Sequence, residues 1–175
     1  AASSLEELAN GEFKRVIGEV DDLDPKKVKR VILCSGKVYY DLVNARREKK
    51  INDIAIVRLE QLYPFPKDSL EKEMAKYPKA TEIVWAQEEP RNQGAWYWMA
   101  SRHHLVSQIG PKQKLLLVAR PASSSPTTES SAVRAPRAAA LRATLAAPPR
   151  RFSSRSTLTT GTGASGEMRL TSPNQ

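Results

Sequence analysis

Four short apolar runs alternate with three amphipathic stretches in the first two-thirds of the chain. The apolar runs predict strands at residues 29–34, 53–59, 82–86 and 114–119. The amphipathic stretches predict helices at residues 38–50, 67–77 and 93–108. This alternation of strand and helix is typical of a parallel sheet with right-handed crossovers.

The predicted strands are apolar along their whole length, which indicates burial on both faces. We therefore expect helices on both faces of the sheet and a three-layer α/β domain spanning residues 29–120. Cys34 is the single cysteine and lies inside an apolar run. The sequence thus predicts a buried thiol at Cys34 and excludes an internal disulfide.

Two segments flank this domain. Residues 1–28 form a lead-in, with a short helix, a strand or irregular packed piece around Val16, and a polar linker at 21–27. Residues 121–175 are rich in Ser, Thr, Pro, Ala and Arg and contain a single aromatic residue. Such a composition cannot bury enough apolar surface to offset chain entropy, so we expect a disordered tail.

Charge separates the tail from the rest of the chain. The chain carries 28 Lys and Arg against 19 Asp and Glu, a net charge of +9. Residues 1–120 account for +4 and residues 121–175 for +5, the latter with seven Arg and no Lys. A charge of +4 on the folded part gives no support for nucleic-acid binding. The tail leaves two interpretations open: a segment that binds nucleic acid or anionic lipid, and an unselected segment such as a frame-shifted reading of a GC-rich gene.

The ends of the chain and its apolar stretches bear on location. No apolar stretch approaches the roughly 20 residues that a membrane helix needs, so we expect no membrane partner. The first residues lack the basic start and apolar core of a secretory signal, and the chain lacks an initiator Met. We therefore expect the chain to be a fragment of a longer protein.

Four motifs point to a known family. They are, in chain order, LCSGKVYY at 33–40, IAIVRLEQLYPFP at 54–66, QEEPRNQGAW at 87–96 and RPASSSP at 120–126. In this order and at this spacing they resemble the C-terminal domain of the thiamine-diphosphate-dependent decarboxylating component of 2-oxoglutarate dehydrogenase. The resemblance covers about residues 3–128 and includes the upstream segment SSLEELANG.

The resemblance implies a transketolase-type C-terminal fold and a supporting role. Intact members of the family decarboxylate 2-oxoglutarate in the tricarboxylic acid cycle on thiamine diphosphate with magnesium. They then pass the succinyl group to the lipoyl group of the second component, a lipoyl-bearing succinyltransferase, within a multienzyme complex. The resemblance further implies a homodimer, supported by this domain. We expect it in the cytoplasm of a bacterium, the favoured source, or in the mitochondrial matrix if the source is a eukaryote.

The chain departs from what that chemistry needs. It contains neither a Gly-Asp-Gly…Asn cassette for magnesium and diphosphate nor the domain that supplies the cofactor-activating Glu. His103 and His104 are adjacent and would point about 100° apart on a helix, so they form no chelating pair. We expect the chain alone to bind neither cofactor nor metal and to have no decarboxylase activity. After Thr128 the final helix of the family is missing, which suggests a truncated or frame-shifted end.

An anion or effector site is predicted at Ser35, Gly36 and Lys37, where a strand passes into a helix. Ligands of parallel sheets bind beyond the strand C-termini, and backbone N–H groups at a helix start favour anions. The alternative is a tight turn that requires Gly36 and leaves Lys37 solvated.

Gln61 joins this candidate set through a resemblance. Actinobacterial relatives bind acetyl-CoA as an activator at positions that correspond to Glu12, Arg15, Gln61, Asp68 and Ser69. Only Gln61 matches, and Asp68 and Ser69 replace an expected basic pair. We therefore expect acetyl-CoA regulation to be absent.

A second candidate set, a possible interface, follows the third predicted strand and comprises Glu88, Glu89, Asn92, Gln93 and Trp96. Paired carboxylates can do acid–base work or bind a cation, but adjacent acids point apart, which favours salt bridging. Asn92 suits a helix N-cap. Trp96 and Trp98 either pack against a neighbouring domain or subunit, or belong to the local core.

Three functions from different classes remain at this point. The first is the C-terminal domain of the dehydrogenase component, acting through interfaces. The alternative is a stand-alone anion- or nucleotide-binding α/β module, although the chain has no Gly-x-Gly-x-x-Gly or Walker-type loop. The third is a nucleic-acid-binding protein driven by the tail. The resemblance ranks the first highest, so nucleic acid is not an expected partner.

Overall fold

The computed structural model describes residues 5–124. In chain order the elements are α1 (Leu5–Asn10), β1 (Val16–Ile17), β2 (Arg30–Cys34), α2 (Val38–Glu48), β3 (Ile54–Leu59), α3 (Lys67–Met74), β4 (Glu82–Pro90), α4 (Trp96–Met99), the 3-10 turn η1 (Leu105–Gln108) and β5 (Lys114–Arg120). The prediction of a disordered tail falls, beyond residue 124, outside the described residues.

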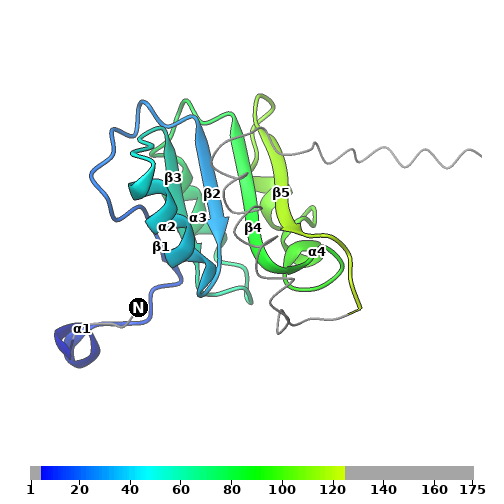
Figure 1. The fold of residues 1–175 in the computed structure, drawn as a ribbon, viewed down its shortest axis with the longest axis horizontal. Helices are drawn as coiled ribbons and strands as arrows, with labels where there is room; N and C mark the ends of the chain where they lie inside the picture. Colours follow the sequence, from blue (N-terminus) through cyan, green and yellow to red (C-terminus); the bar gives the residue numbers. More distant parts are fainter. Residues whose placement is uncertain (1–4, 125–175) are drawn as a thin grey trace, which may run out of the picture.

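The five strands form one sheet in the order β1-β3-β2-β4-β5 (Figure 1). The four longer strands run parallel, with Val31 of β2 opposite Ala55 of β3 and Ile83 of β4. β1 pairs antiparallel with the outer side of β3, Val16 opposite Leu59. The α/β class is confirmed. The purely parallel sheet is wrong, because the lead-in adds a short antiparallel strand that makes the sheet mixed.

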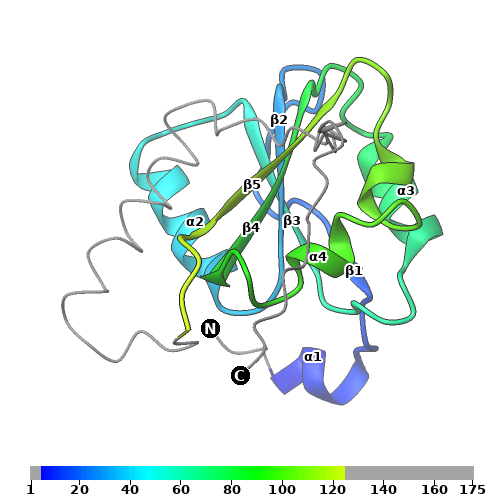
Figure 2. The ribbon, with the colours of Figure 1, turned by 90° about the vertical axis from the view of Figure 1, so that its right-hand side faces the viewer.

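Helices cover both faces of the sheet, as the all-apolar strands predicted. α2 lies on one face, and α3, α4 and η1 lie on the other (Figure 2). On the α2 face, Leu42 and Val43 pack with Ile32 and Ile56. The core of the other face contains side chains from both the strands and the helices, including Val31, Val57, Leu70, Ile83, Trp85, Trp96, Met99 and Leu105. The sheet is therefore the middle of three layers.

Cys34 is fully buried in the α2 face, as predicted. Burial raises the pKa of its thiol to about 12, so the thiolate is scarce at neutral pH. This cysteine acts as a small core residue.

The predicted helix at 93–108 is wrong. The structure has only the one-turn α4, and η1 follows after a turn. Hydroxyl groups account for the break, because Ser101 hydrogen-bonds Nδ1 of His104 and Ser107 donates to the carbonyl of His104 at 2.7 Å. Such local side-chain bonds compete with helical backbone bonds. The other helices end two to three residues earlier than predicted, and β4 continues to Pro90.

The predicted polar linker is attached to the domain through a buried arginine. Arg46 of α2 is 1% exposed and hydrogen-bonds Glu19, Asp21 and the carbonyl of Ile54. Glu19 also accepts a 2.8 Å bond from the backbone N–H of Ile56 in β3. Burial alone raises the pKa of Glu19, but these hydrogen bonds outweigh it and leave that pKa lowered. We call Glu19, Asp21 and Arg46 the arginine cluster.

Candidate functional site

A pocket of about 840 Å³ lies where β2 and β4 end. From β2 the chain passes to β3 on one side, and from β3 it crosses to β4 on the other side of β2. The loops after β2 and β4 consequently leave toward opposite faces and open a crevice between them. Ligands of open α/β sheets bind in such a crevice, at the point where the strand order reverses. We call the side where the parallel strands end the carboxyl edge and this crevice the switch-point pocket.

The floor of the switch-point pocket is apolar and its rim is aromatic. Val38, Ala86 and Ala95 are among the apolar lining residues. Tyr63 and Trp98 lie at the rim with their ring centroids 5.9 Å apart. Tyr63 is 78% exposed and Trp98 43%. Exposed aromatic side chains next to an apolar hollow are typical of a contact surface.

Ser35, Gly36 and Lys37 form one wall of this pocket. Gly36 has φ +69°, and a side chain there would meet no neighbouring atom. Backbone conformation, not lack of space, is therefore what requires glycine at this turn. Lys37 is exposed and precedes α2, whose first turn has no side-chain cap.

Glu88 and Glu89 form the opposite wall. A Cβ on Gly94 would lie 3.0 Å from the Glu89 carboxylate and 3.0 Å from the amide of Gln87, and Gly94 has φ +69°. Glycine is therefore required on both grounds. The pocket holds one cation, Lys37, against two carboxylates, so its charge does not favour an anion over a zwitterion or an amine.

Gln61 does not join Ser35, Gly36 and Lys37. It lies in a separate hollow of about 340 Å³ whose lining includes Arg15 and the start of α3. Its side-chain amide donates to the carbonyl of Pro64 at 2.7 Å. The prediction that Gln61 forms one site with the turn after β2 is wrong, because the turn after β2 and the loop after β3 that carries Gln61 line two different hollows.

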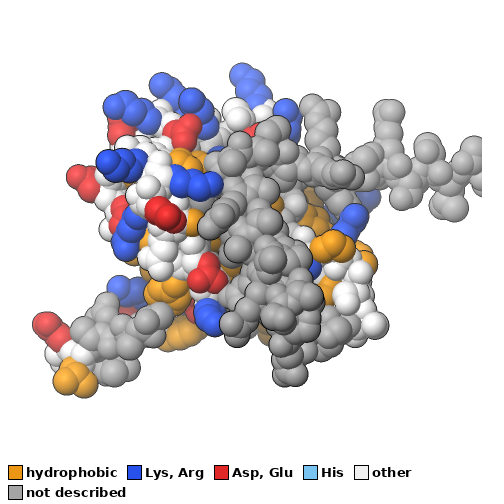
Figure 3. Space-filling view, in the orientation of Figure 1, with side chains coloured by type: hydrophobic (Ala, Val, Ile, Leu, Met, Phe, Trp, Pro, Cys, Tyr) orange, Lys and Arg blue, Asp and Glu red, His pale blue; other side chains and the backbone are white. Residues whose placement is uncertain are grey.

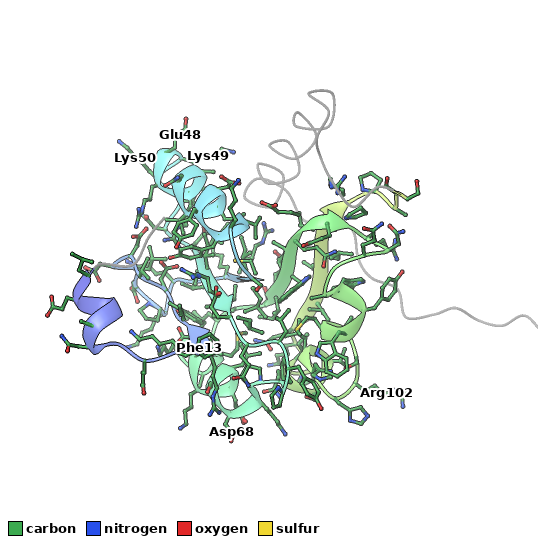
Figure 4. The ribbon with its side chains drawn as sticks, turned by 90° about the horizontal axis from the view of Figure 1, so that it is seen from below. Phe13, Glu48, Lys49, Lys50, Asp68 and Arg102 are labelled. Atoms are coloured by element: carbon green, nitrogen blue, oxygen red, sulfur yellow. The ribbon has the colours of Figure 1, made fainter. Side chains whose placement is uncertain are left out.

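This second hollow gathers four of the five positions that the resemblance to actinobacterial members had matched to an acetyl-CoA site. They are Arg15, Gln61, Asp68 and Ser69. Asp68 lies in the first turn of α3 and projects from its outer side (Figure 4). An anionic ligand there would meet this carboxylate.

Asn92 and Gln93 hold the chain that follows β5. The Asn92 side chain donates to the Ser123 carbonyl and accepts from the Ser123 N–H, both at 3.0 Å. Gln93 donates to the same carbonyl at 3.0 Å. The N-cap prediction for Asn92 is wrong, since Ala95 occupies that position of α4.

Of the two tryptophans proposed for an interface, Trp96 is fully buried in the core and only Trp98 is exposed. The interface prediction for Trp96 is therefore wrong. Its burial follows from the direction of α4, which turns Trp96 and Met99 toward the sheet. Trp98 donates its Nε1 hydrogen to the carbonyl of Leu62 at 3.1 Å, which fixes the rim.

Sequence reasoning missed the role of Gln87. Its Oε1 accepts from Nε1 of Trp85 at 2.9 Å and from the N–H of Trp96 at 3.0 Å. Its Nε2 donates to the carbonyls of Pro90 and Gln93 at 3.1 and 2.7 Å. One buried amide thereby connects β4, the following loop and α4 beneath the pocket. The signal was a lone glutamine at the end of an apolar run.

His104 packs between aromatic rings and does not face a partner histidine. Its ring centroid lies 4.7 Å from that of Phe65 and 4.2 Å from that of Trp98. Burial, and then the neighbouring His103, lower the pKa of His104. Across residues 5–124 no three His, Cys, Asp or Glu side chains gather as metal ligands would. None of the helices in this part of the chain has the length and apolarity that crossing a bilayer requires.

Comparison with known proteins identifies the family of this chain. A family model described as 2-oxoglutarate dehydrogenase C-terminal matches residues 2–145. A 2-oxoglutarate dehydrogenase E1 component from Haemophilus influenzae is 56% identical over 126 residues, covering 72% of this chain and 13% of the relative. One from Cupriavidus necator is 55% identical over 126 residues with the same coverage. A 2-oxoadipate dehydrogenase complex component E1 from Xenopus laevis is 46% identical over 129 residues, which again cover 72% of this chain and 13% of the relative.

The chain thus spans 13% of the length of these three relatives. The family model covers far more than half of the chain, including every strand of the sheet and both walls of the switch-point pocket. This chain belongs to the 2-oxoglutarate dehydrogenase C-terminal family.

Proposed function

We propose that the chain is the C-terminal domain of a 2-oxoglutarate dehydrogenase E1 component, the decarboxylating oxidoreductase of that complex. The intact protein would oxidatively decarboxylate 2-oxoglutarate and pass the succinyl group to lipoyl groups. The observation that carries this proposal is the 53–56% identity to bacterial E1 components over 126 to 135 residues.

The 2-oxoglutarate assignment rests on the difference between two groups of relatives. Those named for 2-oxoadipate are 46–48% identical. Three bacterial 2-oxoglutarate dehydrogenase E1 components are 53–56% identical, and an oxoglutarate dehydrogenase from Buchnera aphidicola is 48% identical. Both groups carry this domain, and we expect the residues that distinguish the two acids to lie in other parts of the intact enzyme.

The domain acts by contact and not by chemistry. Thiamine diphosphate and magnesium do not fit the switch-point pocket, because its only carboxylates, Glu88 and Glu89, sit opposite Lys37 and have no third acidic or histidine ligand nearby within residues 5–124. Other domains of the intact protein would hold both groups. The fold of this domain would be of the transketolase C-terminal type.

The aromatic rim supplies the contact. Tyr63 and Trp98 expose large rings beside an apolar hollow, and such rings contribute most when a partner covers them. Neighbouring domains or the second subunit of a homodimer would cover this rim in the intact enzyme. The lipoyl-bearing succinyltransferase is the functional partner, and the bacterial cytoplasm is the location that the identities favour.

A second candidate, a stand-alone anion- or nucleotide-binding module, draws on the gathering of Ser35, Gly36 and Lys37 at the topological switch point. The two carboxylates across the pocket weigh against it for anions. Calorimetric titration of the 175-residue chain with ATP and with inorganic phosphate tests this candidate directly, and heat that saturates and disappears in Lys37→Ala would favour it.

A chimera tests the main proposal. The corresponding C-terminal part of the Haemophilus influenzae E1 component is replaced by this 175-residue chain, and 2-oxoglutarate-dependent reduction of ferricyanide is measured. We expect turnover within about tenfold of the parent, because more than half of the positions are identical. The parent lacking its C-terminal part is the control and should be inactive.

Two outcomes of this experiment would contradict the proposal. One is a chimera that is folded and dimeric but has no turnover. The other is decarboxylation of 2-oxoglutarate by the 175-residue chain alone, which would place the chemistry inside this domain.

A further inference from the structure

The loops that lead into the parallel strands carry a concentration of lysine. These loops, taken together with the last two residues of α2 and the first residues of β4 and β5, span residues 22–29, 47–53, 75–82 and 109–114 and define the amino edge of the sheet. Together they contain ten Lys and Arg and five Asp and Glu, a net charge of +5. Residues 5–124 as a whole contain 21 Lys and Arg and 17 Asp and Glu, a net charge of +4. The amino edge therefore holds all of the net positive charge, and the rest of the described domain has a charge of −1.

The nine lysines of the amino edge are all exposed. Figure 3, in the orientation of Figure 1, shows Lys and Arg side chains along the upper margin, where the strands begin. Lys49 and Lys50 project outward from the end of α2 beside Glu48 (Figure 4). Their ammonium groups are accessible to a partner that approaches this edge.

Only some of these lysines are neutralised. Lys27 and Lys29 lie 3.6 Å from the carboxylates of Asp24 and Asp53, and Lys76 lies 2.5 Å from Glu73. The remaining six form no ion pair with any residue that the structure describes; they are Lys26, Lys49, Lys50, Lys79, Lys112 and Lys114. Six unneutralised charges along one edge produce a positive potential that reaches about 10 Å at moderate salt.

We propose that the amino edge is a docking surface for an acidic surface of a partner protein. This inference goes beyond the proposed function and does not depend on it. The contact is electrostatic, fast and salt-sensitive, because charge complementarity raises association rates more than affinity.

The side chains of the amino edge fit carboxylates better than nucleic acid. Nine of its ten cations are Lys, and the single Arg47 is already held by Asp21 through bonds of 2.5 to 3.2 Å. Phosphate recognition favours the guanidinium fork. Single-stranded nucleic acid also needs aromatic side chains for stacking. The exposed aromatic residues, Phe13, Tyr63, Tyr97 and Trp98, all lie outside the four loops.

The same surface does not suit a membrane. Peripheral membrane contacts combine basic residues with apolar side chains that insert between lipids. Within residues 5–124, no large exposed hydrophobic side chain belongs to these loops. The five interspersed acids also fit the mixed charges of a protein surface better than a uniform layer of phosphates.

The test uses the full 175-residue chain and fluorescent poly-L-glutamate as the probe, with anisotropy measured at about 50 mM and about 200 mM salt. A triple charge reversal, K49E/K79E/K112E, changes one exposed lysine on each of three loops. We expect its affinity at the lower salt to fall about tenfold or more, and the difference from the unmodified chain to shrink at the higher salt.

A matched triple reversal at the carboxyl edge, K14E/K67E/R91E, changes the net charge equally. Because these three cations lie at the opposite edge, we expect less than a twofold loss of affinity. Circular dichroism and thermal unfolding of both triples establish that each is folded.

Equal losses from the two triples would overturn the inference, since the effect would then be one of total charge. A double-stranded DNA oligonucleotide and vesicles of phosphatidylglycerol and phosphatidylcholine complete the test. If K49E/K79E/K112E weakens either of these as much as it weakens poly-L-glutamate, the surface is a general polyanion surface and a carboxylate-bearing partner is not its ligand.

Discussion

The two edges of one sheet have opposite characters. The carboxyl edge is hollowed by the switch-point pocket, bears exposed rings of Tyr63 and Trp98, and its loops at 35–37, 60–66, 88–95 and 121–124 carry a net charge of −1. The amino edge has unpaired lysines and no exposed ring. Apolar, shaped surfaces favour lasting contacts, whereas charged convex ones favour brief encounters. This difference supports both proposals: the carboxyl edge would be a buried contact within the intact protein, and the amino edge would be a surface for transient docking of a partner.

The two edges are also held together by different chemistry. The amino edge is fixed by the arginine cluster, which fastens the segment before β2 to α2 and β3. The carboxyl edge is fixed by the neutral amide of Gln87. The first arrangement is charged and depends on pH, and the second does not.

The largest expected effect comes from breaking the arginine cluster. Arg46→Ala leaves Glu19 buried without its cation, and we expect the free energy of unfolding to fall by about 3–5 kcal/mol, measured by urea denaturation. Glu19→Gln keeps one hydrogen-bonding oxygen and should cost less, about 1–3 kcal/mol. Arg47→Ala, at a half-exposed arginine on the same Asp21, is the control and should cost under about 1 kcal/mol. Equal losses at Arg46 and Arg47 would contradict the assigned role of burial.

The next effect concerns the carboxyl edge. Gln87→Ala leaves the buried N–H groups of Trp85 and Trp96 without their acceptor, so we expect a loss of about 2–3 kcal/mol in unfolding free energy. Tryptophan fluorescence should shift to longer wavelength as water reaches Trp85. Gln93→Ala, whose side chain bonds only the Ser123 carbonyl, should cost less than half as much. An unchanged unfolding free energy in Gln87→Ala would show that the amide network does not stabilise the pocket floor.

Acid should weaken the amino edge before the carboxyl edge. Hydrogen bonds from Arg47, ahead of those from Arg46, lower the pKa of Asp21 from 3.8 to about 2. Because the folded-state pKa is depressed, the stabilisation is complete above about pH 4 and is lost as the pH falls through 2. Between pH 5 and pH 2, the unfolding free energy of the unmodified chain should therefore fall more steeply than that of Asp21→Asn. Parallel slopes for the two proteins would rule out this contribution.

The smallest expected effect is at the aromatic rim. Tyr63→Ser removes a ring that is 78% exposed, so the unfolding free energy should change by no more than about 0.5 kcal/mol. The fluorescence of the apolar dye ANS bound to the chain should nevertheless fall, because the rim loses apolar surface. In the E1 chimera the same substitution should lower the dimer fraction, which analytical ultracentrifugation measures. An unchanged dimer fraction would argue against the rim as a buried contact.

Much of the layered core was predictable from sequence because burial on two faces leaves a strong pattern. Residues 31–34 and 115–119 are apolar at every position, a pattern that a strand buried on both faces needs and a half-exposed helix does not. Clustering of Ser35, Gly36, Lys37 with Glu88 and Glu89 in one pocket also follows from parallel topology, since loops after neighbouring strands share an edge.

The predictions failed where strand pairing or side-chain hydrogen bonds decide the local structure. A strand around Val16 was one of two alternatives, but β1 has only two residues, too few for any periodicity, so its antiparallel pairing with the free side of β3 could not be predicted. The failed helix at 93–108 has ordinary helical spacing, which local hydroxyl bonds override. Glu19 and Arg46 are 27 positions apart, and Gln87 is followed by Glu88 and Glu89, so the sequence did not indicate which partners either network joins.

The antiparallel direction of β1 and the Asn92–Ser123 pair have a joint mechanical consequence. Arg15 accepts hydrogen bonds from Glu60 and Gln61 just past β3, so the chain joins the sheet at the same edge where Ser123 leaves it. A force that pulled the chain before β1 away from the chain after β5 would act on these two strands, which are the outermost in the sheet. We expect the two-residue pairing of β1 with β3 to separate first and the hydrogen bonds of the arginine cluster to resist the force next, while the four parallel strands stay paired.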